Sequence, residues 1–112
     1  MKFTNGGSAN MTSYKGDVST TFAELVAIFG KPKYGPNADL DKTTCEWVLT
    51  YEDGTVATIY DWMATRTPMG HFKWHIGGYD KRAVEHVLET IRFYRDPLVK
   101  AVVDYRDNHS PL

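Results

Sequence analysis

The chain has 112 residues, of which 42% are hydrophobic and 24% charged, and its net charge at pH 7 is −1. This length predicts a single domain with its own core. The balanced charge gives no overall field that would attract nucleic acid or an anionic membrane, and it excludes a strongly acidic DNA mimic.

Cysteine usage and hydropathy point to a soluble protein of a reducing compartment. Cys45 is the only cysteine, so no intrachain disulfide forms, and we expect its thiol to be buried as a small apolar group. No run of 18 apolar residues is present to span a membrane. Residues 1–10 are polar and glycine-rich, which predicts a flexible arm before a single domain over 11–106 and a frayed tail over 107–112.

The first elements expected are a strand and a short helix. Residues 11–19 are typical of a strand. Thr21 and Glu24 have the spacing of a capping box, which predicts a helix over 22–29 with its apolar residues on one face. Gly30 then ends this helix.

Three strands follow in the middle of the chain. Residues 43–52 and 55–63 are rich in β-branched and aromatic side chains, and the Asp-Gly pair at 53–54 predicts a hairpin between them. A third strand over 71–76 is expected to break at Gly77 and Gly78.

Two helices close the chain. Asp80 is a candidate N-cap for a helix over 81–94, and the Asp96-Pro97 pair predicts a new helix over 97–106. We expect Leu98, Val102 and Tyr105 to face inward from this last helix. The predicted order is β-α-β-β-β-α-α, an α+β fold in which the helices pack on one face of an antiparallel β-meander.

The hairpin turn decides which side chains share a face. A two-residue turn would place Trp47 and Tyr60 on the same face. A three-residue loop with Gly54 in a left-handed conformation would separate them, because it pairs Tyr51 with Thr55. We favour the three-residue loop, because it places the apolar side chains on one face of the sheet and the mixed set on the other.

One helical layer cannot cover all the aromatic side chains of this sheet. Exposed apolar surface on a small protein usually marks an interface, most simply a homodimer across the open face. The alternative is that the N-terminal arm or the loop over 31–42 folds over these residues. The interface residues predicted are Glu46, Val48, Tyr60 and Trp62.

Several stretches together resemble a known group of proteins. "FGKP", "EWVLTYEDGTVATIYDW", "WHIGG" and "KRAVEHV" occur together within residues 20–90. This combination resembles small uncharacterised proteins of tailed bacteriophages. The resemblance implies a viral origin and action in the cytoplasm of a bacterial host, where accessory proteins of this size commonly bind a host protein, a defence complex or a signalling nucleotide. It implies no catalytic residues.

The residues themselves favour neither a metal site nor catalysis. His71 and His75 lie four apart on a predicted strand, which separates them by about 13 Å, and no helical His pair or cysteine partner is present. The sequence lacks a nucleophile elbow. We therefore expect no metal, no cofactor and no enzymatic activity.

An anion site is the alternative functional site. The two glycines before a helix N-terminus predict a phosphate cradle, and the cations Lys81 and Arg82 are unfavourable to the helix itself. The simpler interpretation is a sharp turn with solvated cations. The residues of this candidate site are Arg66, Lys73, His75, Gly77, Gly78, Lys81 and Arg82.

Two functions from different classes therefore remain. The first is a non-enzymatic, homo-oligomeric protein that binds and inhibits a host defence protein through the aromatic sheet face. The second is a protein that sequesters a nucleotide-like molecule near the glycine pair. Neither involves a membrane, and nucleic acid is not an expected partner.

Overall fold

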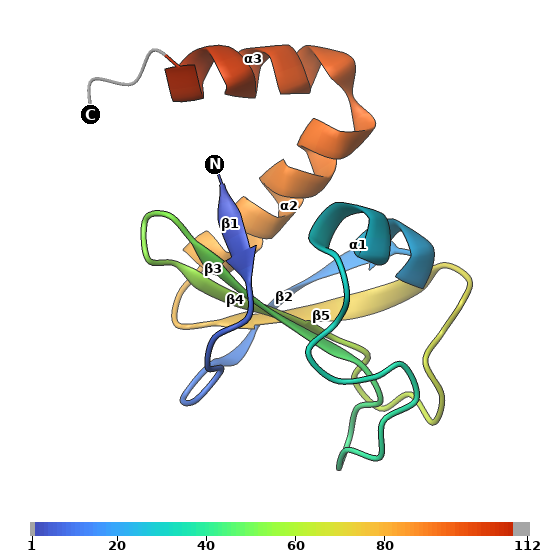
Figure 1. Ribbon diagram of the computed structural model, residues 1–112. Coiled ribbons are helices and arrows are strands. Elements are labelled where there is room, and N and C mark those ends of the chain that lie inside the picture. The colour runs from blue at the N-terminus through green and yellow to red at the C-terminus, as the bar shows by residue number, and fades with distance from the viewer. Residues whose placement is uncertain (1, 109–112) are drawn as a thin grey trace.

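The computed structural model describes residues 2–108. It contains a five-stranded sheet and three helices (Figure 1). In chain order the elements are β1 (Phe3–Asn5), β2 (Ser13–Thr20), α1 (Phe22–Phe29), β3 (Glu46–Tyr51), β4 (Val56–Tyr60), β5 (Phe72–Gly78), α2 (Arg82–Arg95) and α3 (Pro97–Asn108).

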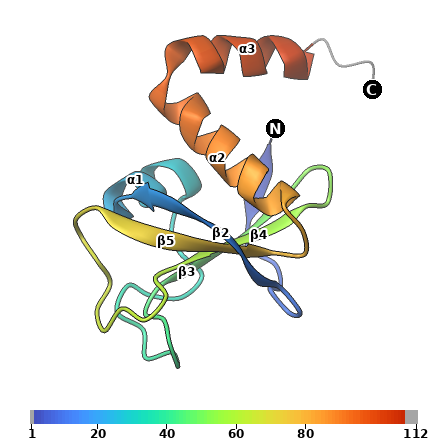
Figure 2. The same ribbon diagram turned by 180° about the vertical axis from the view of Figure 1, so that it is seen from behind.

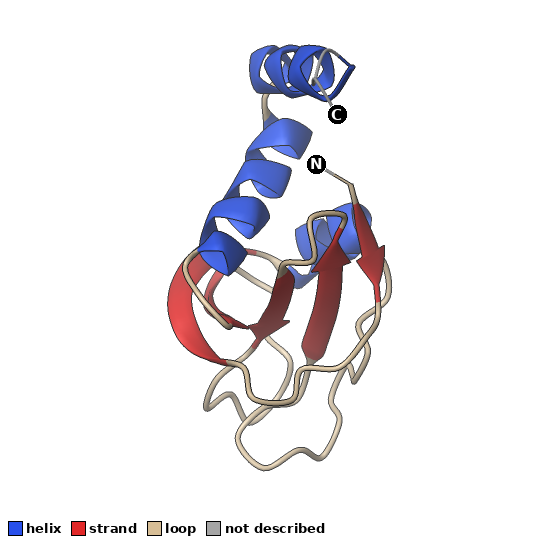
Figure 3. Ribbon diagram, turned by 90° about the vertical axis from the view of Figure 1, so that its left-hand side faces the viewer, coloured by secondary structure: helices blue, strands red, loops and turns tan. Residues whose placement is uncertain are grey.

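The sheet is antiparallel throughout, with the strand order β1-β3-β4-β5-β2. The helices lie on one side of it, which confirms the predicted α+β class (Figure 3). α1 and α2 pack near the sheet, whereas α3 lies beyond the far end of α2 (Figures 1 and 2). No helix in the described residues is long and apolar enough to cross a membrane.

The N-terminal residues differ from the expected arm, because residues 3–5 form the edge strand β1, paired with β3. β1 and β2 occupy opposite edges of the sheet, so residues 6–12, here called the crossing segment, pass across the face opposite the helices. The Gly6 amide donates to the Val48 carbonyl oxygen over 2.7 Å, and the Thr50 hydroxyl donates to the Gly6 carbonyl over 3.4 Å. We call the face of the sheet opposite the helices the open face.

The β3–β4 hairpin has the predicted three-residue loop. Leu49 pairs with Ala57, and the Tyr51 amide donates to the Thr55 carbonyl oxygen over 2.8 Å. Gly54 adopts a φ of +89°, which L side chains rarely adopt. This register directs Trp47, Leu49, Ala57 and Ile59 to the helix side, where all four are fully buried.

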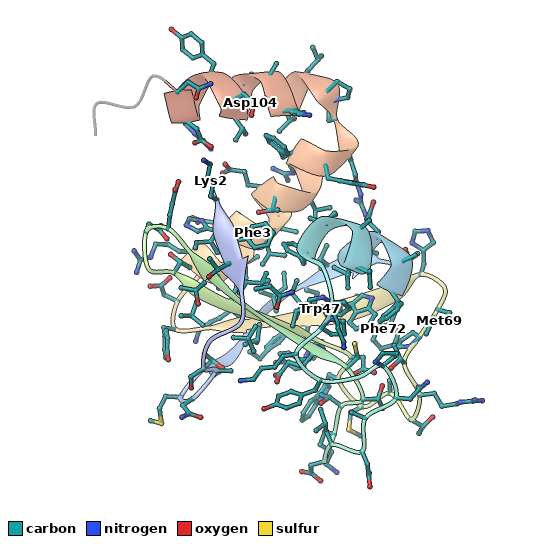
Figure 4. All side chains as sticks on the ribbon, in the orientation of Figure 1. Lys2, Phe3, Trp47, Met69, Phe72 and Asp104 are labelled. Atoms are coloured by element: carbon teal, nitrogen blue, oxygen red, sulfur yellow. The ribbon has the colours of Figure 1, made fainter. Side chains whose placement is uncertain are left out.

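The core lies between the sheet and helices α1 and α2. Trp47 contacts Trp74 edge-to-face at a centroid distance of 5.6 Å, and its indole donates to the Gly30 carbonyl oxygen over 2.8 Å (Figure 4). Arg95 of α2 pairs with Glu24 of α1. These contacts hold the helical layer on the apolar face of the sheet.

The expected packing of α3 is wrong. Leu98, Val102 and Tyr105 are 77%, 67% and 65% exposed, and Val103 is the buried residue of this helix. The Leu98 amide donates to the Asp96 side chain over 2.9 Å, so the predicted N-cap is present. Because the new helix starts beyond the edge of the sheet, its apolar stripe does not reach the core.

Gly54 and Gly70 form a matched pair for testing the hairpin. A Cβ added at either position meets nothing within 4 Å, but only Gly54 has a positive φ. We expect Gly54→Ala to lower the free energy of unfolding by about 1 kcal/mol. Gly70→Ala should change it by less than about 0.5 kcal/mol or raise it slightly. Urea denaturation measures both, and equal effects would contradict the left-handed turn.

Candidate functional site

One residue from each of four adjacent strands forms a row across the open face. Asp17 pairs with His75, His75 with Tyr60, and Tyr60 with Glu46. Adjacent strands lie about 4.8 Å apart, so these four side chains are immediate neighbours. We call them the open-face row. The row therefore begins and ends with a carboxyl group and has an imidazole and a phenol between them.

Three aromatic rings surround His75 in the middle of the row. The Trp62 ring is nearly parallel to the imidazole, at an interplanar angle of 21° and a centroid distance of 6.1 Å. Tyr14 and Tyr60 contact the imidazole at centroid distances of 4.5 and 5.6 Å. Trp62 is 44% exposed and Tyr14 52% exposed. The rings therefore support His75 while leaving apolar surface open to solvent.

The Asp17 end of the row is only half satisfied. The Tyr14 hydroxyl donates to Asp17 Oδ2 over 2.9 Å, and this hydrogen bond raises the pKa of Tyr14. Asp17 Oδ1 is buried and lies 3.6 Å from His75 Nε2, without a hydrogen bond within residues 2–108. This oxygen therefore faces the imidazole of His75 and is closed to solvent.

The Glu46 end is desolvated. Burial raises the pKa of Glu46, and the positive charge of Lys33 opposes this effect in part. Burial, followed by the charge of Glu46, raises the pKa of Tyr60. At neutral pH this part of the row combines an acidic group that is costly to bury with a neutral phenol.

A hollow of about 350 Å³ opens beside Glu46, Tyr60 and Trp62. Its floor includes Gly77, where an added Cβ would lie 2.5 Å from the Thr58 hydroxyl oxygen. The absence of a side chain at position 77 therefore preserves the close packing of β4 and β5 under the hollow. The remaining lining residues are Thr12, Ser13, Asp41, Lys42, Thr43 and Thr58.

Asp61 fixes the backbone that presents Tyr60 and Trp62. Its side chain is fully buried, and Oδ1 accepts the amides of Thr44 and Cys45 over 2.7 and 2.9 Å. The Thr44 hydroxyl donates to Oδ2. These bonds tie the end of β4 to the residues that precede β3, so both walls of the hollow are anchored by one carboxylate.

The four predicted interface residues have different surroundings. Trp62 is exposed, and Glu46 and Tyr60 are partly buried beside the hollow. Val48 is fully buried where the crossing segment begins, so its side chain is not available to a partner. The alternative that other segments of the chain fold over the open face therefore holds for Val48 and does not hold for Trp62.

The structure does not bring the predicted anion-site residues together. Gly77 and Gly78 belong to β5 and pair with β2 and β4, so they do not form the expected turn. An added Cβ at Gly78 would lie 2.4 Å from the Ala83 Cβ, which explains a glycine in this strand. The sequence interpretation missed that a glycine can mark close packing of a helix, here α2, against a strand, here β5.

The predicted cations are dispersed. Arg82 forms an ion pair with Asp80 over 2.9 Å, and Lys81 is exposed beside it. Lys73 is exposed on β5, in line with His75, whereas Arg66 is exposed in the connection between β4 and β5. His75 and Gly77 lie at the open-face row and its hollow, so only these two of the predicted anion-site residues belong to the site described here.

A second hollow, of about 240 Å³, lies between α2, α3 and the start of β1. His86, one of its lining residues, has Nε2 2.7 Å from Asp53 Oδ2, and this contact lowers the pKa of Asp53. The nearby Thr90 hydroxyl donates to the His86 carbonyl oxygen over 2.7 Å. The contact between His86 and Asp53 links the β3–β4 turn to α2. Figure 4 shows Lys2 and Asp104 at this hollow.

Cys45 has the predicted environment. Its side chain is fully buried, and desolvation raises the pKa of its thiol to about 12. The thiolate is the reactive form of cysteine, so this residue is a packing group.

Comparisons with protein-family models, with curated proteins and with solved structures gave no match.

The Asp61 network gives a prediction about the walls of the hollow. Asp61→Ala leaves two buried amides without acceptors, and we expect it to lower the free energy of unfolding by about 2–4 kcal/mol. Asp61→Asn keeps one acceptor oxygen and should cost less than half as much. The exposed Asp41→Ala is the control, with a change below about 0.5 kcal/mol. Equal losses for Asp61→Ala and Asp41→Ala in urea denaturation would contradict the anchoring role.

Proposed function

We propose that this chain is a non-enzymatic binding protein whose open face takes a partner protein. The observation that carries this proposal is the exposed aromatic surface of Tyr14 and Trp62 around His75. Aromatic side chains are enriched at protein interfaces and dominate their binding energy. The hollow next to Trp62 provides a depression into which an anchoring side chain fits.

The acidic side chains of the open-face row and its hollow favour a protein over a nucleotide. Asp17 and Glu46 end the open-face row, and Asp41 lines the hollow. A phosphate group placed among these carboxylates would be repelled. The amides of Gly77 and Gly78 lie within the sheet, so a phosphate cradle at this pair has no geometric support.

The biological setting of the proposal comes from the phage resemblance. In that setting the partner is a host protein in the bacterial cytoplasm, and occupation of its surface inhibits it, with a defence protein as the target. Homodimerisation through the open face also remains a prediction. It would compete with a host partner for Tyr14 and Trp62.

Substitution of the exposed rings tests the proposal. The affinity-tagged chain is used to capture partners from a bacterial lysate, and the captured proteins are quantified by mass spectrometry. We expect Trp62→Ala and Tyr14→Ala each to reduce one specific partner by at least about tenfold, since interface aromatic anchors contribute 2 kcal/mol or more.

Tyr94 supplies the matched control. It is 55% exposed and lies on α2, away from the open face, so Tyr94→Ala removes a similar ring and should leave capture unchanged. A partner captured equally by all variants, or lost only with Tyr94→Ala, would contradict the proposed face. Circular dichroism of each variant checks that the fold is retained.

A further inference from the structure

The Glu46 carboxylate is a partly desolvated acceptor at the edge of the hollow. Glu46 is partly buried on β3, and within residues 2–108 its side-chain oxygens make no hydrogen bond and no ion pair closer than 4 Å. Transfer of a charged carboxylate out of water is costly unless the group is paired. This carboxylate borders the hollow together with Tyr60 and Trp62, so a ligand in the hollow reaches it directly.

A second carboxyl group, that of Asp17, lies at the opposite end of the row. Asp17 Oδ1 is buried and has no hydrogen-bond partner in the described residues. The two acids lie on either side of His75 and Tyr60 in the sheet register. Carboxyl groups at both ends of an aromatic surface are complementary to a cation that also donates hydrogen bonds.

Arginine matches this combination best. Its planar guanidinium stacks on an aromatic ring and donates two parallel hydrogen bonds to a carboxylate. Lysine provides a point charge without the planar fork. Lys42 is the only cation among the residues that line the hollow, and it is exposed at the rim, whereas Asp41 and Glu46 contribute two negative charges.

We propose that the hollow receives an arginine side chain of the partner protein, stacked on Trp62 and paired with Glu46. This inference rests on the proposed function, because it names the anchoring residue of the same interface. The hollow of about 350 Å³ accommodates a guanidinium, and the exposed part of Trp62 is available to the rest of the partner.

The probe is N-acetyl-arginine N-methylamide, with its neutral citrulline analogue as the control. Nuclear magnetic resonance follows the indole N–H of Trp62, and Trp62→Phe assigns this signal. We expect a saturable shift with the arginine probe, with a Kd in roughly the millimolar range for so small a ligand. The citrulline analogue should bind at least about tenfold more weakly, since it lacks the charge.

Glu46→Gln and Glu52→Gln form a matched pair. Each removes one negative charge, but Glu46 is the first residue of β3, whereas Glu52 is exposed in the turn at the opposite end of that strand. We expect Glu46→Gln to weaken the arginine probe by roughly tenfold, while Glu52→Gln leaves its affinity unchanged. The indole signals of the buried Trp47 and Trp74 report whether each variant keeps its fold.

An absent or non-saturating shift would overturn the proposal, as would equal binding of arginine and citrulline or equal effects of the two glutamine variants. The citrulline comparison uses the unaltered chain, so it tests the proposal even if Glu46→Gln does not fold. A partner that still depends on Trp62 while the arginine probe fails would refute only the arginine anchor. A partner that does not depend on Trp62 would refute the interface itself.

Discussion

The structure depends on the register of the β3–β4 hairpin. Side chains alternate between the two faces of a strand, so a shift of one residue would exchange the buried and open sets. Gly54 sets this register by adopting a positive φ in a three-residue loop. The same turn that buries Trp47 therefore places Glu46 and Tyr60 on the open face, and it makes the core and the candidate site consequences of a single constraint.

A second constraint follows from the strand order. β1 and β2 are consecutive in sequence but occupy opposite edges of the sheet, so the crossing segment must cross one face. The helices occupy the other face (Figure 3). On the open face, Val48 is fully buried and Trp62 is 44% exposed. The open face is thus divided into a covered part, which contributes to stability, and an exposed part, which we assign to binding.

The sequence predicted elements that depend on local signals. The Asp-Gly turn, the Thr21 cap and the break at Asp96 each involve residues within a few positions, and each is present. β1 was missed because residues 3–5 have no strand pattern and become a strand only by pairing with β3. The apolar stripe of α3 was recognised, but its direction depends on where α2 ends relative to the sheet.

The candidate site was only partly predictable for the same reason. Glu46, Tyr60 and Trp62 follow from the hairpin register, which is local. Tyr14 and Asp17 join them through the pairing of β2 with β5, where the register shifts between Tyr14 and Gly16. No pattern within the sequence determines this distant pairing.

Hydroxyl-radical footprinting of the complex tests most directly whether this face binds a partner. We predict that the partner lowers the oxidation of Tyr14 and Trp62 severalfold and leaves that of Tyr94 and Leu98 unchanged, and the reverse pattern would contradict the account.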